Sequence, residues 1–337
     1  MKQLFFNSKP NAFPLLVGII VSILFFTGCN PTQKAYAEIQ SQRKALQSKA
    51  PISEILITDP TTITKDLQFL SSDSLKGRFP GTKESYIAQD FIINRLKKLG
   101  VSSFNDTYKQ HFTYTNNGTY FPDATNIAGC IRGTTYPEDY IVLSAHYDHL
   151  GVIDSKIYNG ADDNASGVCG LLALAQYFSI HKPSHSLVFC FFDAEESEGT
   201  AGSAYFVDHS PINLSSIKMN INLDMISRND TNDELIIVGT NYHPKLRKII
   251  APLQNLTNID VLFGFDKPVK KTAFIDNWTE SSDHAPFHKK GIPFLYLGVM
   301  DTPDYHQHTD EFEKVNLKFY GSVVNLITNI VLELDKN

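Results

Sequence analysis

The sequence predicts an α/β fold with a mostly parallel central sheet and helices on both faces. Near-continuous apolar runs, such as 140–146 and 186–192, are typical of strands that are buried on both faces. Segments with helical periodicity separate these runs, as the connections of a parallel sheet require. The chain has 337 residues, of which 42% are hydrophobic and 20% charged, and its sequence contains no internal repeat, so we expect one large domain.

Each predicted element rests on its own apolar pattern. The segment 83–99 places Ala88, Ile92 and Leu96 on one face of a helix, and Gly100 follows as a typical end signal. The same reading predicts helices at 61–70, 83–99, 165–181, 199–207, 243–253 and 317–334, and strands at 108–114, 126–131, 140–146, 186–192, 217–225, 234–239 and 292–297.

The N-terminus has the pattern of an export signal. Lys2 and Lys9 precede an apolar run at 12–26, which is shorter than the ~20 residues that a membrane-spanning helix needs. The run ends in Phe-Thr-Gly-Cys29, which resembles a bacterial lipoprotein lipobox, although an ordinary signal peptide or a single anchor helix is an alternative. We therefore expect an exported lipoprotein, attached to the membrane through an N-terminal lipid and facing the periplasm or the cell surface. Its predicted parts are a signal peptide at 1–28, a polar tether at 29–52 that starts with the lipidated Cys29, and a globular domain at 53–337.

Acidic and imidazole side chains follow several of the predicted strands, where an open parallel sheet binds its ligands. They are His146, Asp148, Asp162, Asp163, Glu195, Glu196, Asp224 and His306. Two like charges ~4 Å apart repel by about 4 kcal/mol at an effective dielectric of 20, so either some acids are protonated or metal ions lie among them. Two divalent ions suit this number of acids. Imidazole with carboxylate favours zinc, although cobalt or manganese could also bind.

Five motifs, in order, resemble those of the M28 family of zinc aminopeptidases. They are AHYDHLG at 145–151, NGADDNASG at 159–167, FFDAEESEGTAGS at 191–203, NLDMISR at 222–228 and YHQHTD at 305–310. LKGRFPGT at 75–82, SDHAPF at 282–287 and GIP at 291–293 resemble further elements of that family, so the resemblance covers about 60–335. It implies an M28-like peptidase domain at 53–337 with the three-layer, phosphorylase/hydrolase-type sandwich of zinc exopeptidases.

The resemblance implies a centre with two Zn²⁺ ions and a role for each residue around them. Asp163 would bridge both ions, and a cis peptide bond would follow it. The remaining ligands would be Glu196 and His306 on one ion, and His146 and Asp224 on the other. Glu195 would be the general base, and Tyr305 is a candidate donor to the oxyanion of the reaction.

Several neighbouring residues are expected to support this centre. Asp148 would hold the His146 ring by a hydrogen bond, and Asp283 would belong to the surrounding polar network. Asp162 is expected to be structural, and Asp310 to orient the loop of His306. Two alternatives remain open for the other two histidines of the motifs, His149 and His308. They either take part in catalysis or are polar loop residues.

The resemblance implies a metal-dependent exopeptidase, most simply an aminopeptidase that hydrolyses peptides through a metal-bridging hydroxide. The residue that would bind a free amine is not identifiable from the sequence, so dipeptidase and carboxypeptidase activities remain open. A glutaminyl cyclase with one zinc ion on the same fold is the first alternative, and a catalytically inactive, receptor-like homologue is a more remote one. With a net charge of −6 and no basic stripe, the chain is not expected to bind nucleic acid.

Overall fold

The computed structural model describes residues 31–47, 49–230, 233–267 and 277–337. The predicted signal peptide and Cys29 lie outside the described residues.

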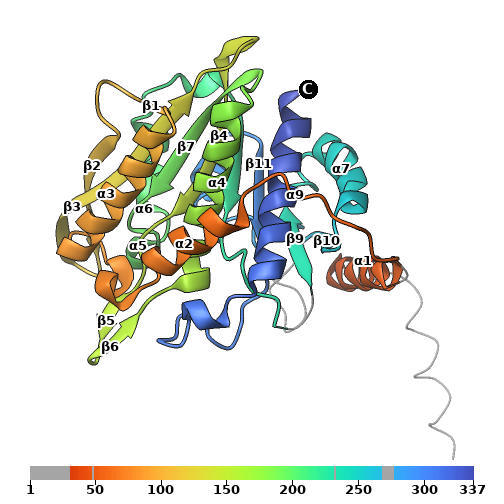
Figure 1. The fold of residues 1–337 in the computed structure, drawn as a ribbon, viewed down its shortest axis with the longest axis horizontal. Helices are drawn as coiled ribbons and strands as arrows, with labels where there is room; N and C mark the ends of the chain where they lie inside the picture. The colour runs from red at the N-terminus through yellow and green to blue at the C-terminus, as the bar shows by residue number, and fades with distance from the viewer. Residues whose placement is uncertain (1–30, 48, 231–232, 268–276) are drawn as a thin grey trace, which may run out of the picture.

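Three α-helices come first in the described chain and six strands follow them, and helices and strands mostly alternate from residue 167 onward (Figure 1). The strands are β1 (Ser102–Ser103), β2 (Lys109–Asn116), β3 (Thr119–Ile131), β4 (Tyr136–His146), β5 (Gly151–Ile153), β6 (Lys156–Tyr158), β7 (His185–Phe192), β8 (Ile217–Leu223), β9 (Glu234–Val238), β10 (Asp260–Phe263) and β11 (Phe294–Gly298). The α-helices are α1 (Pro31–Leu46), α2 (Pro60–Leu70), α3 (Lys83–Lys98), α4 (Gly167–Ile180), α5 (Glu195–Glu198), α6 (Ala201–Asp208), α7 (Pro244–Ile250), α8 (Ala285–Lys289) and α9 (Leu317–Asp335). Short 3₁₀ segments are η1 (Asp73–Arg78), η3 (Leu214–Ser216), η4 (Ala251–Leu256) and η5 (Phe312–Lys314), and η2 (Ala161–Ser166) is a turn with non-helical backbone at Asp163 and Asn164.

A nine-stranded sheet forms the centre of the described part of the chain. Its four middle strands, in the order β7–β4–β8–β11, are parallel. The sheet continues with antiparallel pairs on both sides, where β3 pairs with β7 and β9 pairs with β11. The register places His146 opposite Phe192 and Ser144 opposite Asn222, so the carboxyl ends of β4, β7 and β8 reach the same edge.

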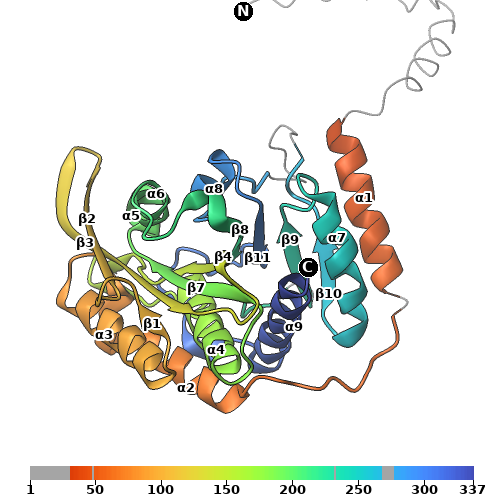
Figure 2. The ribbon, with the colours of Figure 1, turned by 90° about the horizontal axis from the view of Figure 1, so that it is seen from above.

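Helices cover both faces of this sheet, as Figure 2 shows from above. α2, α3, α4 and α9 lie on one face, and α5, α6 and α8 lie on the other. Successive strand residues point to opposite faces, so Ile141 and Leu143 join the larger core whereas Val142 joins the smaller one. The predicted fold class is confirmed, and the structure adds that β3 and β9 pair antiparallel with the parallel middle strands.

The elements that the sequence did not predict are short or polar. β5 and β6 have three residues each and α8 has five, which is too short for a periodic pattern to be recognised. β10 has four residues, and α1 presents mainly polar side chains, with Ala35 and Ile39 buried.

α1, which lies within the predicted tether, packs beside β10 at one edge of the sheet (Figure 2). The Gln42 side chain pairs with the main chain of Phe263, since its Nε2 donates to the carbonyl at 2.9 Å and its Oε1 accepts from the N–H at 3.0 Å. Arg43 also binds both carboxylate oxygens of Glu234 at 2.8 Å. The helix therefore covers polar main-chain groups that β10 would otherwise expose.

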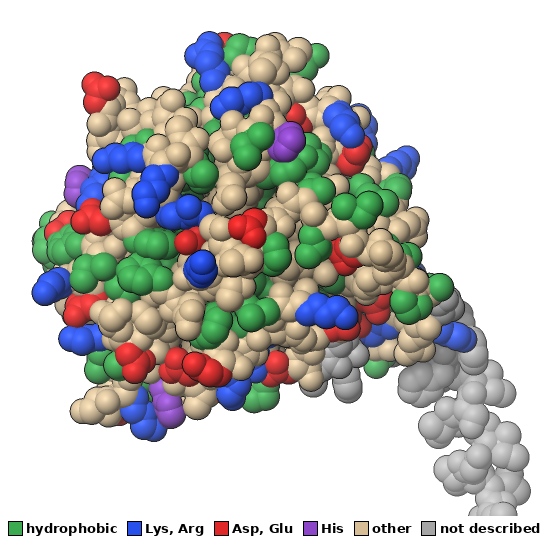
Figure 3. Space-filling model, in the orientation of Figure 1, with side chains coloured by type: hydrophobic (Ala, Val, Ile, Leu, Met, Phe, Trp, Pro, Cys, Tyr) green, Lys and Arg blue, Asp and Glu red, His purple; other side chains and the backbone are tan. Residues whose placement is uncertain are grey.

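Among the described helices, α9 alone is long and apolar enough to cross a membrane by length and hydropathy. However, 67% of its most apolar window is buried inside the protein, as in a core helix. The face shown in Figure 3 has acidic and basic side chains interspersed among apolar and uncharged groups.

Candidate metal centre

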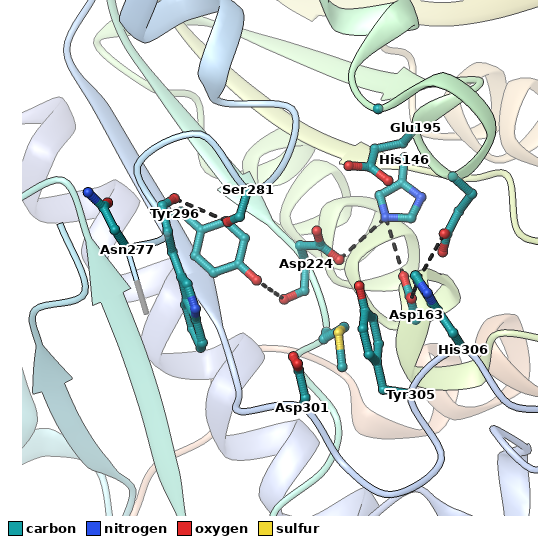
Figure 4. A pocket seen from close by; sticks show the side chains of 14 residues that line it. His146, Asp163, Glu195, Asp224, Asn277, Ser281, Tyr296, Asp301, Tyr305 and His306 are labelled. Atoms are coloured by element: carbon teal, nitrogen blue, oxygen red, sulfur yellow. Dashed lines mark hydrogen bonds and ion pairs between the residues drawn. The ribbon is translucent and has the colours of Figure 1, made fainter. Parts of the chain in front are cut away.

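The candidate site lies where the parallel strands end. His146 is the last residue of β4, Asp224 directly follows β8, and Glu195 begins α5 after β7. Asp163 lies in η2, and His306 lies in the loop that follows β11. Figure 4 shows that these side chains converge on one place.

Asp163 lies at the centre of this group and faces an imidazole with each of its carboxylate oxygens. Its Oδ1 is 3.4 Å from His146 Nε2, and its Oδ2 is 3.3 Å from His306 Nε2. Asp224 Oδ1 lies 3.4 Å from the same nitrogen of His146, and Glu196 Oε2 lies 3.0 Å from the same nitrogen of His306. The five predicted ligands therefore form two adjacent donor groups that share Asp163. The peptide bond from Asp163 to Asn164 is cis, as the resemblance implies.

The protonation of the imidazoles depends on the acids around them. Burial opposes protonation of His146, but Asp224 and the other nearby carboxylates raise its pKa well above the ordinary value. Burial likewise opposes protonation of His306, yet Asp163 and Glu196 raise its pKa to about 10. Burial disfavours the Asp163 carboxylate, but the hydrogen bonds from both imidazoles hold its pKa well below the ordinary range. The surrounding carboxylates therefore favour a positive charge at the centre of the site.

The donor set suits zinc. The ligand atoms of His146, Asp163 and Asp224 lie within 4.8 Å of one another, as do those of His149, Asp163 and Glu196. Asp224 Oδ1 is buried and accepts no hydrogen bond from the described residues, so it is free to bind a cation. Imidazole nitrogen and carboxylate oxygen are common zinc ligands.

Asp148 organises the turn that carries the two glutamates. Its carboxylate accepts hydrogen bonds from the N–H groups of Glu195 and Glu196 at 3.1 and 3.2 Å. The nearer partner of His146 Nδ1 is the main-chain carbonyl of Asp148, at 3.3 Å, whereas the carboxylate lies 3.6 Å away. Asp148 is thus beside the imidazole, as predicted, but its carboxylate mainly fixes the start of α5.

A cavity of about 520 Å³ opens beside the two donor groups. Tyr305 lines it and stacks on His306, with ring centroids 3.8 Å apart, and Figure 4 shows its hydroxyl directed toward the acids. Trp278 and Tyr296 form an aromatic wall. His284 helps to fix this wall because its Nε2 lies 2.9 Å from the Trp278 carbonyl oxygen. The cavity therefore combines polar donors with apolar surface.

Asp283 is fully buried near the centre. Neither of its carboxylate oxygens makes a hydrogen bond within the described part of the chain, and burial raises its pKa to about 7. Its influence on the ligands is therefore electrostatic and does not involve a direct hydrogen bond.

Asp310 connects the two loops of the site. Its carboxylate accepts hydrogen bonds from the main-chain N–H groups of Asp162, at 3.1 Å, and Asp163, at 3.0 Å. Because Asp310 follows His306 in the same loop, these bonds set the distance between His306 and the Asp163 turn.

Arg78 is a buried cation to which the sequence analysis assigned no role, although it stands in the LKGRFPGT motif. It is 1% exposed and donates to four main-chain carbonyls, which are those of Tyr147 at 2.8 Å, Leu70 at 2.5 Å, Asn159 at 2.7 Å and Gly160 at 3.2 Å. Burial lowers its pKa to about 10, so it remains charged at neutral pH. Arg78 therefore connects the end of α2, the residue after His146 and the segment that leads to Asp163.

Comparison with known proteins assigns the chain to a family. Residues 126–331 match the family model described as peptidase family M28. The chain belongs to peptidase family M28. The expected resemblance is thereby confirmed.

Curated relatives include peptidases that are longer than this chain. Aminopeptidase YwaD of Bacillus subtilis is 30% identical over 209 residues, which are 59% of this chain and 42% of that protein. A probable zinc metalloprotease of Pyrenophora tritici-repentis is 27% identical over 239 residues, which are 62% of this chain and 54% of that protein. The chain thus spans about half the length of these curated relatives.

Solved structures share the fold. BSAP, a zinc aminopeptidase from Bacillus subtilis, matches with a TM-score of 0.66 at 17% identity, over 83% of this chain and 96% of its own. Porphyromonas gingivalis glutaminyl cyclase matches with a TM-score of 0.66 at 19% identity, over 82% of this chain and 99% of its own. Since an aminopeptidase and a cyclase match equally well, the fold does not separate the two activities.

We expect Arg78→Met to lower the free energy of unfolding by about 3–5 kcal/mol, because it leaves buried carbonyls without a donor and buried acids without a cation. Urea unfolding followed by circular dichroism measures the change. Arg132→Met is the matched control, since Arg132 forms an exposed ion pair with Glu138 and should cost less than about 1 kcal/mol. Equal stability losses in the two variants would contradict the role given to Arg78.

Proposed function

We propose that this M28 protein is a zinc-dependent aminopeptidase that removes N-terminal residues from peptides. The observation that carries the proposal is the position of Asp163, whose two oxygens face two separate donor groups. Membership of the peptidase family and similarity to aminopeptidase YwaD support the reaction class.

Two zinc ions would be held by the two donor groups. Asp163 would bridge them, with His146 and Asp224 completing one set and Glu196 and His306 the other. When bound, zinc supplies Lewis-acid chemistry, since it polarises a carbonyl group and lowers the pKa of water.

Glu195 is the proposed general base. Its carboxylate lines the cavity, and its donor atoms lie within 4.8 Å of those of His146 and Glu196. Its main-chain N–H is fixed by Asp148, so its side chain is held beside the ligands. Glu195 would accept a proton from the attacking water and return it to the leaving amine. The Tyr305 hydroxyl would donate a hydrogen bond to the developing oxyanion.

A one-zinc glutaminyl cyclase is the second candidate, favoured only by the likeness of fold to the Porphyromonas gingivalis enzyme. A single zinc ion would fill one of the two donor groups. The closely spaced acids of the other group would then repel one another with no divalent cation between them. The two donor groups around Asp163 therefore favour the two-zinc peptidase.

We also propose that the chain is exported and attached to the membrane through a lipid on Cys29. The support for this attachment is the sequence pattern at 12–29, in which an apolar run follows basic residues and ends in Thr-Gly-Cys.

Chelation of zinc is expected to abolish hydrolysis of aminoacyl-p-nitroanilides and to lower Tm, because a ligand present at 100 times its Kd stabilises the folded state by about 2.7 kcal/mol. Metal analysis of the reloaded protein should give two zinc ions per chain, and added zinc should restore activity. Hydrolysis that is insensitive to the chelator would contradict a metallopeptidase. One zinc per chain together with cyclisation of N-terminal glutamine would favour the cyclase.

Glu195→Gln should lower kcat about 10²- to 10⁴-fold, because the amide cannot accept the proton, while zinc content stays unchanged. Glu138→Gln is the control, since Glu138 is exposed near the start of β4, at the end of the strand remote from His146. Steady-state kinetics and metal analysis on the same preparations give both readouts. Wild-type kcat in Glu195→Gln would exclude Glu195 as the base.

Cys29→Ser should abolish incorporation of labelled palmitate and move the protein out of the membrane fraction when the full chain is expressed in bacteria. Cys130→Ser, which leaves the predicted lipidation position intact, should behave like the wild type. Equal labelling of the wild type and Cys29→Ser would show that Cys29 carries no lipid.

A further inference from the structure

His149 lies three residues after His146 in the loop that follows β4, and its side chain is completely buried. Its Nδ1 is 2.8 Å from Glu196 Oε1. A carboxylate oxygen can only accept, so Nδ1 must carry the hydrogen in this bond. The other oxygen of the same carboxylate, Oε2, lies 3.0 Å from His306 Nε2. The two oxygens of Glu196 therefore have different partners.

The place of the His149 ring is fixed by close packing against the main chain of Gly160. Gly160 has a φ of +57°, and a Cβ atom added there would lie 2.4 Å from His149 Cγ. Arg78 donates to the Gly160 carbonyl and holds this segment from the other direction. Only glycine allows the ring to pack so closely on the segment that leads to Asp163.

We infer that His149 is a positioning residue, which binds Glu196 Oε1 and leaves Oε2, on the side of Asp163 and His306, as the ligand oxygen. This inference rests on the proposed zinc centre. By holding one oxygen, His149 would limit rotation of the carboxylate and favour binding through a single oxygen.

The rival is that His149 is itself a zinc ligand, since its donor atoms lie within 4.8 Å of those of Asp163 and Glu196. One observation opposes it, which is that the ring is not among the described residues that line the cavity, whereas His306 is. The hydrogen bond from Nδ1 to Glu196 is compatible with either role, because His149 Nε2 is buried and has no hydrogen-bond partner among the described residues. A change of position that brought the ring to the cavity would also separate it from Gly160.

Two substitutions separate the hydrogen bond from the volume of the ring. His149→Asn retains an N–H donor close to the place of Nδ1, whereas His149→Leu retains only the volume. In the full chain, we expect His149→Leu to lower zinc affinity 10- to 100-fold at one of the two sites, and His149→Asn to stay within about threefold of the wild type. Competition with a chromogenic chelator measures the affinity, and His181→Leu, at the exposed end of α4, is the control.

A double-mutant cycle tests whether His149 acts through Glu196. In a Glu196→Gln background, His149→Leu should cause little further loss of affinity, whereas additive losses would favour the ligand rival and overturn the inference. Asn and Leu variants with equal affinities would also overturn it, even if the wild type binds two zinc ions and hydrolyses peptides. A wild type that binds no zinc would instead remove the proposed function itself.

A structure of the zinc-loaded wild type tests the inference even where the variants fail to fold. We expect Glu196 to bind through Oε2 and neither His149 nitrogen to lie at the coordination distance of about 2.0–2.1 Å from zinc. A His149 nitrogen at that distance would make it a ligand and overturn the inference.

Discussion

The concentration of acidic side chains at the carboxyl edge of a buried parallel sheet is the constraint on which the rest of this structure depends. Water screens such charges poorly inside a protein, so each acid must be protonated, hydrogen-bonded or paired with a cation. Asp162 illustrates the first response, since burial, reinforced by nearby Asp310, raises its pKa to about 8. The two imidazoles next to Asp163 illustrate the last. Because buried acids outnumber cations at this edge, the site favours the binding of divalent cations.

The acids at this edge divide into two kinds according to what their oxygens bind. Asp148 and Asp310 direct both oxygens to main-chain N–H groups and so fix the turns that carry the glutamates and Asp163. Asp162 acts similarly, because its Oδ1 accepts from the N–H of Ser227 at 2.8 Å. Asp163 and Asp224 instead turn their oxygens toward imidazoles. Aspartate side chains thus fix the backbone of the site and also provide its candidate ligand atoms.

Sequence patterns were informative where burial or a motif determined the outcome. The apolar runs of β4 and β7 predicted two strands that are buried on both faces. The motifs predicted that His146 and Asp163 lie at one edge of the sheet, and their side chains are in contact there. The patterns could not reveal which polar group each oxygen binds. Nothing in AHYDHLG distinguishes an Asp148 that holds an imidazole from one that fixes the start of α5. The hairpin β5–β6 and α8 were missed because elements of three to five residues carry no periodicity.

The contact between α1 and β10 has a consequence for association between copies of the protein. β10 is the last strand on its side of the sheet, and Gln42 occupies main-chain groups on its outer side. A shortened protein beginning at residue 53 would present that strand with free N–H and C=O groups, an arrangement that favours sheet extension between molecules. By covering this edge, α1 would limit aggregation of the protein.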